Sequence, residues 1–195
     1  MKTTEILAYK REDLSKAFNK KLRREAYVPG VVYGGEKPKH FYAPTILFRD
    51  LIYTPDAYFV DLNIEGQLTK CVLKEAQFHP VSEVLLHADF FEIADDKKVV
   101  MDIPVQVVGT AEGVKKGGKL FLKTRKVKVK ALPADMPDTI DLDVSSLELG
   151  KSIKVEAINV EGVEIMTNSN VSVASVEIPR ALRQSLQAGG EEEEA

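Results

Sequence analysis

The spacing of apolar residues predicts a helix near the N-terminus. Within residues 14–25, apolar side chains recur at every fourth position, at Leu14, Phe18 and Leu22. Asp13 lies just ahead of this segment, where a side chain that caps a helix is expected. The following Val28-Pro29-Gly30 is predicted to end the helix, because proline disfavours a helical conformation in the residue before it.

Strand patterns occupy most of the remaining first 95 residues. Strands are predicted over residues 6–9, 31–33, 58–64, 69–78 and 84–93. Glu65-Gly66 predicts the turn of a hairpin, and Gly34-Gly35 predicts a second turn. A short second helix is predicted over residues 44–53. Its inward side chains would be Ile46, Leu47 and Leu51.

The pattern changes after the short polar segment at residues 94–98, where we place a domain boundary. Further strands are predicted over residues 99–108, 122–132, 140–144, 153–160 and 171–178. Lysine and valine alternate strictly from Lys126 to Lys130, which predicts one solvated and one buried strand face. Because no helical pattern separates these strands, they predict an antiparallel all-β domain over residues 96–180.

The last residues predict a different kind of segment. One short helical turn is expected just beyond Pro179, and four consecutive acids follow at Glu191–Glu194. Such a run repels itself, so residues 181–195 are predicted to be a disordered acidic tail.

The predicted fold class is therefore mainly β with minor α, in two domains. The chain has 195 residues, enough for two domains of about 100 residues each, the first over residues 1–95. Hydrophobic residues make up 44% of the chain, so each domain can form a packed core. There is no tryptophan, and the cores must depend mainly on valine, isoleucine and leucine.

Charge is distributed unevenly along the chain. The formal net charge is −3, which by itself argues against a nucleic-acid-binding protein. Residues 10–39, however, contain nine basic and four acidic side chains, a surplus of five positive charges. On the predicted helix, Lys16, Lys20 and Arg23 or Arg24 share a face opposite the apolar one. This local surplus favours contact with a phosphate backbone.

Cysteine content and hydropathy limit the compartment. Cys71 is the single cysteine, so a disulfide within the chain and a metal site built on cysteine pairs are excluded. The N-terminus lacks the apolar stretch of a signal peptide. No apolar run approaches the roughly 20 residues that cross a bilayer. We expect a soluble cytoplasmic protein without membrane contact.

The segment Gly113–Lys119 nearly matches a nucleotide-binding phosphate loop. That loop needs serine or threonine after its lysine, but Leu120 follows here. The loop must also begin a helix, whereas the residues from Phe121 on have a strand pattern. We therefore expect a glycine-rich turn that uses positive φ, with no nucleotide, small-molecule substrate or cofactor.

His87 and Asp89 form a second candidate site. Residues two apart in a strand point to the same face. The pair could orient a nucleophile, with Ser82 or Cys71 nearby in sequence, although neither has an activating motif. A metal site with His79 would lack an obvious third ligand. A structural hydrogen bond, or contact with RNA bases, sugars and phosphates, are the remaining interpretations.

The third candidate is the basic helix with the segments after it. Cationic and aromatic side chains lie close together in sequence there, namely Arg11, Tyr33, His40 and Tyr42. Small RNA-binding modules use such mixtures to contact the backbone and unstacked bases. The composition therefore favours RNA binding over a merely solvated helix face.

Three stretches of the chain are specific enough to suggest a family. They are Leu22-Arg23-Arg24-Glu25-Ala26-Tyr27-Val28-Pro29-Gly30-Val31-Val32-Tyr33-Gly34-Gly35, then Gln77-Phe78-His79-Pro80 with Leu86-His87-Ala88-Asp89-Phe90-Phe91, and then Val108-Gly109-Thr110-Ala111-Glu112-Gly113-Val114-Lys115-Lys116-Gly117-Gly118-Lys119-Leu120. Leu132-Pro133 and residues 140–150 extend the third. Together they resemble a bacterial large-subunit ribosomal protein family that binds 5S ribosomal RNA, also called general stress protein CTC.

The resemblance implies an N-terminal RNA-binding β-barrel with short helices, followed by the added all-β domain of the longer family form. It implies a structural protein, not an enzyme, without cofactor or metal. The implied partners are 5S ribosomal RNA and neighbouring large-subunit proteins and ribosomal RNA. The positions that match the family's RNA-binding residues are Arg11, Lys16, Arg23, Arg24, Tyr33, Gln77, His87 and Asp89.

The resemblance also implies a role for each kind of residue. Lys16, Arg23 and Arg24 would neutralise phosphates and set the register. The side chains of Tyr33, His87 and Asp89 would recognise an irregular RNA helix with a wide minor groove. The alternative hypothesis is a stress-response or protein-interaction module that acts off the ribosome through the C-terminal β domain.

Three positions depart from the family pattern. Ser15-Lys16-Ala17 replaces a Gly-Lys-Gly segment, and Asn19-Lys20-Lys21 replaces Ser-Arg-Arg. Lysine keeps the charge there but loses the bidentate geometry of arginine. Ala26 stands where a glycine is expected. If its φ is positive, alanine costs about 1 kcal/mol of strain there.

Overall fold

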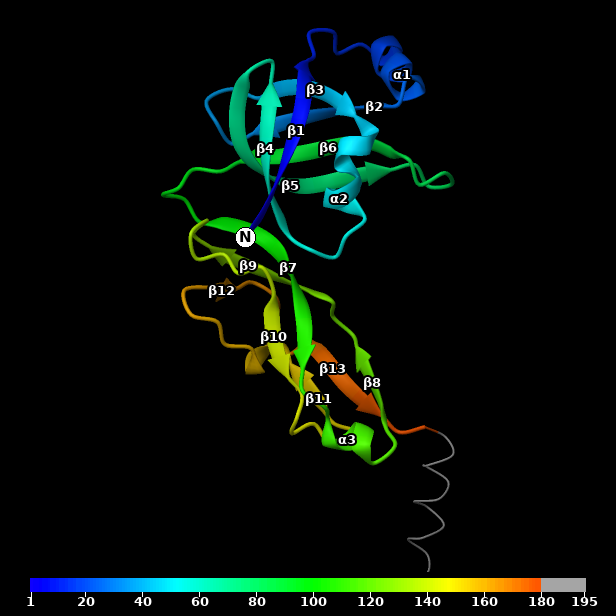
Figure 1. Ribbon diagram of the computed structural model, residues 1–195, viewed down its shortest axis with the longest axis vertical. Helices are drawn as coiled ribbons and strands as arrows, with labels where there is room; N and C mark the ends of the chain where they lie inside the picture. Colours follow the sequence, from blue (N-terminus) through cyan, green and yellow to red (C-terminus); the bar gives the residue numbers. More distant parts are fainter. Residues whose placement is uncertain (180–195) are drawn as a thin grey trace, which may run out of the picture. The chain divides into compact units, whose positions relative to one another are not determined.

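A computed structural model describes residues 1–179, which include all the elements shown as ribbon in Figure 1. The chain divides into two compact units. The first unit comprises Met1–Met101 and Lys130–Asp138, and the second comprises Asp102–Val129 and the described residues from Thr139 on. The short helical turn and the acidic tail predicted beyond Pro179 lie outside the described residues.

The first unit contains a closed β-barrel, visible in the upper part of Figure 1. Its strands are β1 (Lys2–Lys10), β2 (Tyr27–Tyr33), β3 (Lys39–Pro44), β4 (Tyr58–Ile64), β5 (Gln67–Phe78) and β6 (Leu85–Glu92). They close in the order β1-β3-β2-β6-β5-β4, with β1 parallel to β4 and β2 parallel to β6. The mainly β fold class and the barrel are confirmed.

The strands differ from the predicted ones where pairing, not hydrophobicity, sets the ends. β1 begins at Lys2 because its ladder with β4 begins there, and β2 begins at Tyr27, which pairs with Pro44. The sequence pattern missed β3 entirely. The hairpin turn at Glu65-Gly66 is confirmed, since φ is 52° and 92° at its two residues, the sign that tight hairpin turns favour.

The barrel core is built around three phenylalanines. Phe41, Phe48 and Phe90 are fully buried, with ring centroids 5.8 Å apart for Phe41 and Phe90 and 6.3 Å apart for Phe48 and Phe90. Phe48 ends the short 3₁₀ helix η1 (Thr45–Phe48), which leads into α2 (Arg49–Ile52). The predicted inward position of Ile46 is wrong, because 68% of that residue is exposed and Phe48 fills the core instead.

Helix α1 spans Lys16–Arg24, two residues shorter at its start than predicted. The predicted cap at Asp13 is wrong: Ser15 caps the helix, and its hydroxyl accepts a hydrogen bond from the Phe18 amide at 3.3 Å. Asp13 instead accepts from the Ser15 amide at 2.8 Å. Leu14 therefore lies outside the helix and is exposed, whereas Leu22 is buried.

Helix α1 ends at Arg24, one residue before the predicted end, but the reason given for its end is wrong. Pro29 does not end the helix; it lies inside β2, where it pairs with Tyr42 of β3. The ladder between β2 and β6 begins only at Gly30, so a missing amide donor at Pro29 is tolerated. The change of direction occurs at Ala26, whose φ is 60°.

Replacing Ala26 by glycine is expected to raise the free energy of unfolding by about 0.5–1 kcal/mol, because glycine adopts positive φ without strain. The Ala26 carbonyl accepts hydrogen bonds from the Thr45 amide and hydroxyl at 2.9 and 2.7 Å, and glycine retains both. Urea denaturation followed by circular dichroism measures the change. The control is Ala17→Gly inside α1, expected to lower stability by about 1 kcal/mol. Destabilisation by both changes would contradict the strain argument.

Strands beyond the barrel form two sheets in the described part of the chain, in the orders β10-β7-β9-β12 and β11-β13-β8. Their bounds are β7 (Val99–Val108), β8 (Lys119–Leu122), β9 (Lys126–Ala131), β10 (Ile140–Asp143), β11 (Ser152–Lys154), β12 (Glu164–Ile165) and β13 (Ser172–Glu177). The predicted alternation in β9 is confirmed, since Val127 and Val129 are fully buried.

Three details of the predicted C-terminal domain are wrong. The predicted strand 122–132 is two strands, because the Lys123 and Thr124 amides bond to the Val173 carbonyl and turn the chain. The predicted strand 153–160 is β11 followed by the 3₁₀ helix η2 (Val155–Ala157). The pairing is not wholly antiparallel, since β10 runs parallel to β7.

The glycine-rich segment 113–119 begins within a helix that the pattern did not predict, α3 (Glu112–Lys115). Gly117 has φ of 88°, as expected for a turn. Gly113 is required by packing, because a Cβ there would lie 2.7 Å from the Leu149 backbone nitrogen. The segment then leads directly into strand β8 at Lys119, so the helix that a phosphate-binding loop must begin does not follow.

Candidate nucleic-acid interface

Three adjacent barrel strands, β5, β6 and β2, form one outward polar face. On β6, Ala88 and Phe90 are fully buried, so the alternate residues His87 and Asp89 point away from the core. His87 lies opposite Gln77 of β5. Five of the outward side chains on these strands carry polar groups and are called the polar face below. They are Tyr33, Glu75, Gln77, His87 and Asp89.

His87 and Asp89 contact each other on this face. His87 Nδ1 lies 2.5 Å from Asp89 Oδ1, and about one quarter of each side chain is exposed. Asp89 Oδ1 is shielded from solvent. The contact holds the two side chains together on the outward side of β6.

Tyr33 lies at the end of β2, beside the same pair. Its ring packs edge-on against Phe91, with centroids 5.8 Å apart. Partial burial, followed by the negative charges of Asp89 and Glu75, raises the pKa of the Tyr33 hydroxyl. Tyr33 is 38% exposed, so it presents both a ring and a hydroxyl donor at neutral pH.

Helix α1 is joined to the polar face through Arg23. Arg23 Nε donates a hydrogen bond to the Leu86 carbonyl at 3.2 Å, next to His87 on β6. Arg11 is held by Asn19, whose side-chain oxygen accepts from Arg11 Nη1 at 3.0 Å. Burial, and then the neighbouring charge of Arg23, lower the pKa of Arg11. Two guanidinium groups are therefore concentrated where α1 meets the barrel.

The other predicted basic residues lie on the exposed surface of α1. Lys16 is in its first turn and Arg24 in its last, and both are exposed. Lys20 is exposed as well, and Lys21 Nζ lies 4.0 Å from a Glu25 carboxylate oxygen. Exposed pairs of this kind contribute little to stability, so these lysines can move toward an anion.

The structure thus brings Tyr33, Gln77, His87 and Asp89 onto one face and attaches Arg23 to its edge. Glu75, which lies opposite Asp89 on the neighbouring strand, was not predicted from the sequence. Alternation with Gln77 could have placed it there, but the register shift between Leu73 and Glu75 breaks the pattern upstream. Asn19 was missed because its role depends on the position of Arg11 across the fold.

The catalytic and metal interpretations of His87 and Asp89 find no support in the geometry. Cys71 is fully buried, and burial followed by nearby carboxylates raises the pKa of its thiol to about 12. His79 Nδ1 accepts from the Val81 and Ser82 amides at 3.3 and 3.2 Å, so this side chain stabilises a turn. Residues 1–179 contain no group of three or more potential metal ligands.

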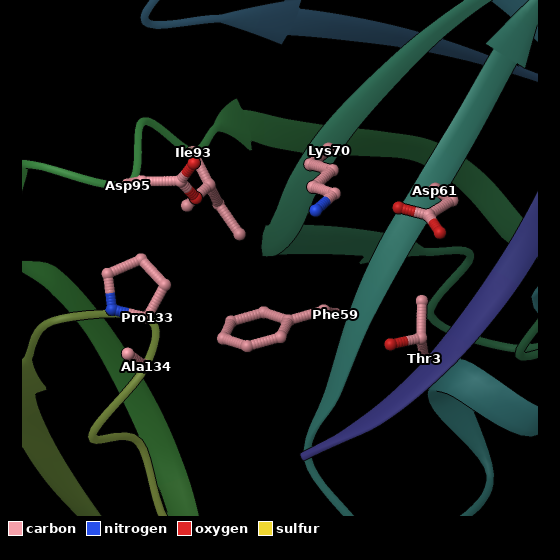
Figure 2. A pocket seen from close by; sticks show the side chains of 8 residues that line it. All are labelled: Thr3, Phe59, Asp61, Lys70, Ile93, Asp95, Pro133 and Ala134. Carbon is pink, nitrogen blue, oxygen red and sulfur yellow. The ribbon is translucent and has the colours of Figure 1, made fainter.

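A pocket of about 300 Å³ lies elsewhere in the first unit. Figure 2 shows the Phe59 ring at its centre, with Lys70 and Asp61 on one side and Pro133 on the other. Thr3, Ile93, Asp95 and Ala134 complete the lining. The charges are mixed and none of the residues belongs to the polar face, so this pocket is not part of the interface. Among the described residues, no helix is long and apolar enough to span a membrane.

Two family models match successive parts of the chain. The Ribosomal L25p family matches residues 6–90, and the C-terminal domain of ribosomal protein TL5 matches residues 98–180. The large ribosomal subunit protein bL25 of Amoebophilus asiaticus is 50% identical over 183 residues, covering 94% of this chain and 93% of that protein. The bL25 protein of Cytophaga hutchinsonii is 50% identical over 184 residues, with 94% and 96% covered. That of Phocaeicola vulgatus is 43% identical, with 97% and 100% covered.

The barrel, its polar face and these matches define the class: a structural ribosomal protein, not an enzyme. Within that class the chain belongs to the bL25 family of large ribosomal subunit proteins. The family resemblance drawn from the sequence motifs is thereby confirmed.

Proposed function

We propose that the chain is a structural constituent of the large ribosomal subunit and that its barrel binds 5S ribosomal RNA. The observation that supports this most directly is the attachment of Arg23 to the Leu86 carbonyl. This hydrogen bond holds the Arg23 guanidinium next to the strand that carries the outward His87 and Asp89, which supports the contact of one RNA segment with all three side chains.

The charges divide the interface into two functions. Arg11, Lys16, Arg23 and Arg24 would neutralise phosphates, which fixes the position of the RNA. The polar face has two carboxylates, Glu75 and Asp89, which repel phosphates. They accept hydrogen bonds from base amino groups and sugar hydroxyls, and these are exposed in an irregular minor groove.

We further propose that residues 1–95 and 96–180 are separate domains and that RNA recognition belongs to the first. The proposed partners of the whole chain are 5S ribosomal RNA, other ribosomal RNA and neighbouring ribosomal proteins, on ribosomes of the cytoplasm. Co-sedimentation with the large subunit in moderate salt tests this against an off-ribosome interaction module, which would remain in the supernatant.

Binding of purified 5S ribosomal RNA is expected to weaken with salt, with a log–log slope of about −3 to −5, because about four to six phosphates would be neutralised. Filter binding in about 50 to 300 mM KCl measures the salt slope of the affinity. A transfer RNA competitor in the same assay measures the selectivity for 5S ribosomal RNA. Arg23→Gln should reduce the slope by about one, whereas Arg49→Gln on α2 should leave it unchanged. A wild-type slope near zero, or equal affinity for the competitor, would refute the proposed function.

A further inference from the structure

A second basic site lies at the end of the barrel where β1 finishes. A pocket of about 260 Å³ opens there between the last residues of β1, the first residues of β3 and the β4–β5 turn. Figure 1 shows these three segments at the same end of the barrel. The lining residues are Lys10, Arg11, Pro38, Lys39, His40, Ile64 and Gln67.

Arg11 and His40 are held side by side in this pocket. The Arg11 amide donates to the His40 carbonyl at 3.0 Å, which continues the β1–β3 ladder beyond Lys10 and Phe41. Arg11 Nε and His40 Nδ1 are both shielded from solvent, and neither has a hydrogen-bond partner among residues 1–179. Buried polar nitrogens are normally paired, so two unpaired ones on neighbouring residues of the same pocket lining point to a hydrogen-bond partner that residues 1–179 do not supply.

The pocket is positively charged. Its lining contains Lys10, Arg11 and Lys39 but no carboxylate. The nearby carboxylates are outside the lining: Lys10 Nζ lies 3.4 Å from Glu12, and Lys39 Nζ lies 3.9 Å from Glu92. A Glu65 oxygen accepts from the Lys10 amide at 3.3 Å. The two side-chain pairs are long and solvent-accessible, so they compete weakly with an anion.

We propose that this pocket binds a phosphate group of the backbone of the RNA that the barrel recognises. The inference rests on the proposed function and extends it to residues outside the family-derived set, namely Lys10, Lys39 and His40. Arg11 connects the two sites, because it lies close enough to Arg23 for their charges to interact. A phosphate at Arg11 would relieve that repulsion. A planar guanidinium beside an imidazole nitrogen provides donors that phosphate oxygens accept.

An RNA backbone fits the pocket better than a free nucleotide does. No phenylalanine, tyrosine or tryptophan lines it, so the small imidazole of His40 is the one ring in the lining that a base could stack on. Cationic side chains instead continue from Arg23 through Arg11 to Lys39, as expected for a path that follows successive phosphates.

The test uses the full chain with Lys39→Gln, His40→Leu and Lys10→Gln. With the wild type, ethylation of one particular phosphate of 5S ribosomal RNA should interfere with binding. With Lys39→Gln and His40→Leu, ethylation of that phosphate should no longer interfere. Affinity should fall about three- to tenfold, and the salt slope of Lys39→Gln should fall by about one. Selectivity over transfer RNA should stay unchanged, because the pocket contacts no base.

Arg49→Gln is the matched control. Arg49 lies on α2, which leads into β4 at the end of the barrel where β1 begins, whereas the pocket lies where β1 ends. Lys39 Nζ also donates a hydrogen bond to the buried Thr69 hydroxyl at 3.1 Å, so thermal melts must show that each variant is folded. The variants Lys10→Gln and His40→Leu leave that hydrogen bond intact. Unchanged affinity, slope and interference in folded variants would overturn the inference while wild-type selectivity still supported the proposed function. Saturable binding of AMP that is lost in His40→Leu would overturn the backbone assignment.

Discussion

Replacing Asp89 by alanine is expected to weaken 5S ribosomal RNA binding by about ten- to a hundredfold, with a similar loss for His87→Ala, because each change removes a hydrogen-bonding group and frees its neighbour. Asp89→Ala removes the carboxylate that fixes His87 Nδ1 at 2.5 Å. The affinity loss should be accompanied by lower selectivity over transfer RNA, since these side chains face bases and sugars. Competition binding measures both quantities.

Controls separate recognition from folding. Asp61→Ala removes a carboxylate on β4, outside the polar face, and should leave RNA affinity within about twofold of the wild type, because Asp61 belongs to neither proposed RNA contact. Circular dichroism of His87→Ala and Asp89→Ala should retain the β signal and the melting temperature within a few degrees of the wild type, because both side chains point away from the core. Early melting of either variant would show that the pair is structural.

A second large effect is expected in the barrel core. Phe90→Ala should lower the free energy of unfolding by about 3–5 kcal/mol, because it leaves a cavity beside the rings of Phe41 and Phe48. Domains of this size are stable by only about 5–15 kcal/mol, so the change removes a large part of the total. Urea denaturation at about 25 °C measures this change in the free energy of unfolding.

The matched control is the same substitution on the surface. Phe78 lies on β5 and is 41% exposed, so Phe78→Ala should cost about 1 kcal/mol or less. Equal losses for the two variants would contradict the placement of Phe90 at the centre of the core. RNA binding by the folded fraction of Phe90→Ala should also weaken, since Phe90 lies between Asp89 and Phe91 on β6.

The sequence by itself determined the parts that depend on local periodicity. Alternation fixed His87 and Asp89 on one strand face, and Glu65-Gly66 specified a turn with two positive φ angles. The motifs around Arg23 and His87 identified the family, because a specific order of residues persists independently of how the strands pair.

Tertiary structure alone decided which distant segments became neighbours. Lys2 and Tyr27 extend their strands only because β4 and β3 provide partners, and such long-range pairing leaves no periodic signal in either segment. The cap is Ser15 and not Asp13, because the helix begins at Lys16 and the Asp13 side chain bonds to the Ser15 amide instead. The pocket at Arg11 and His40 likewise arises from the β1–β3 ladder, which joins two residues 29 positions apart in the sequence. The charge pattern of the sequence indicated basic residues in this region, but it could not indicate that they line one pocket.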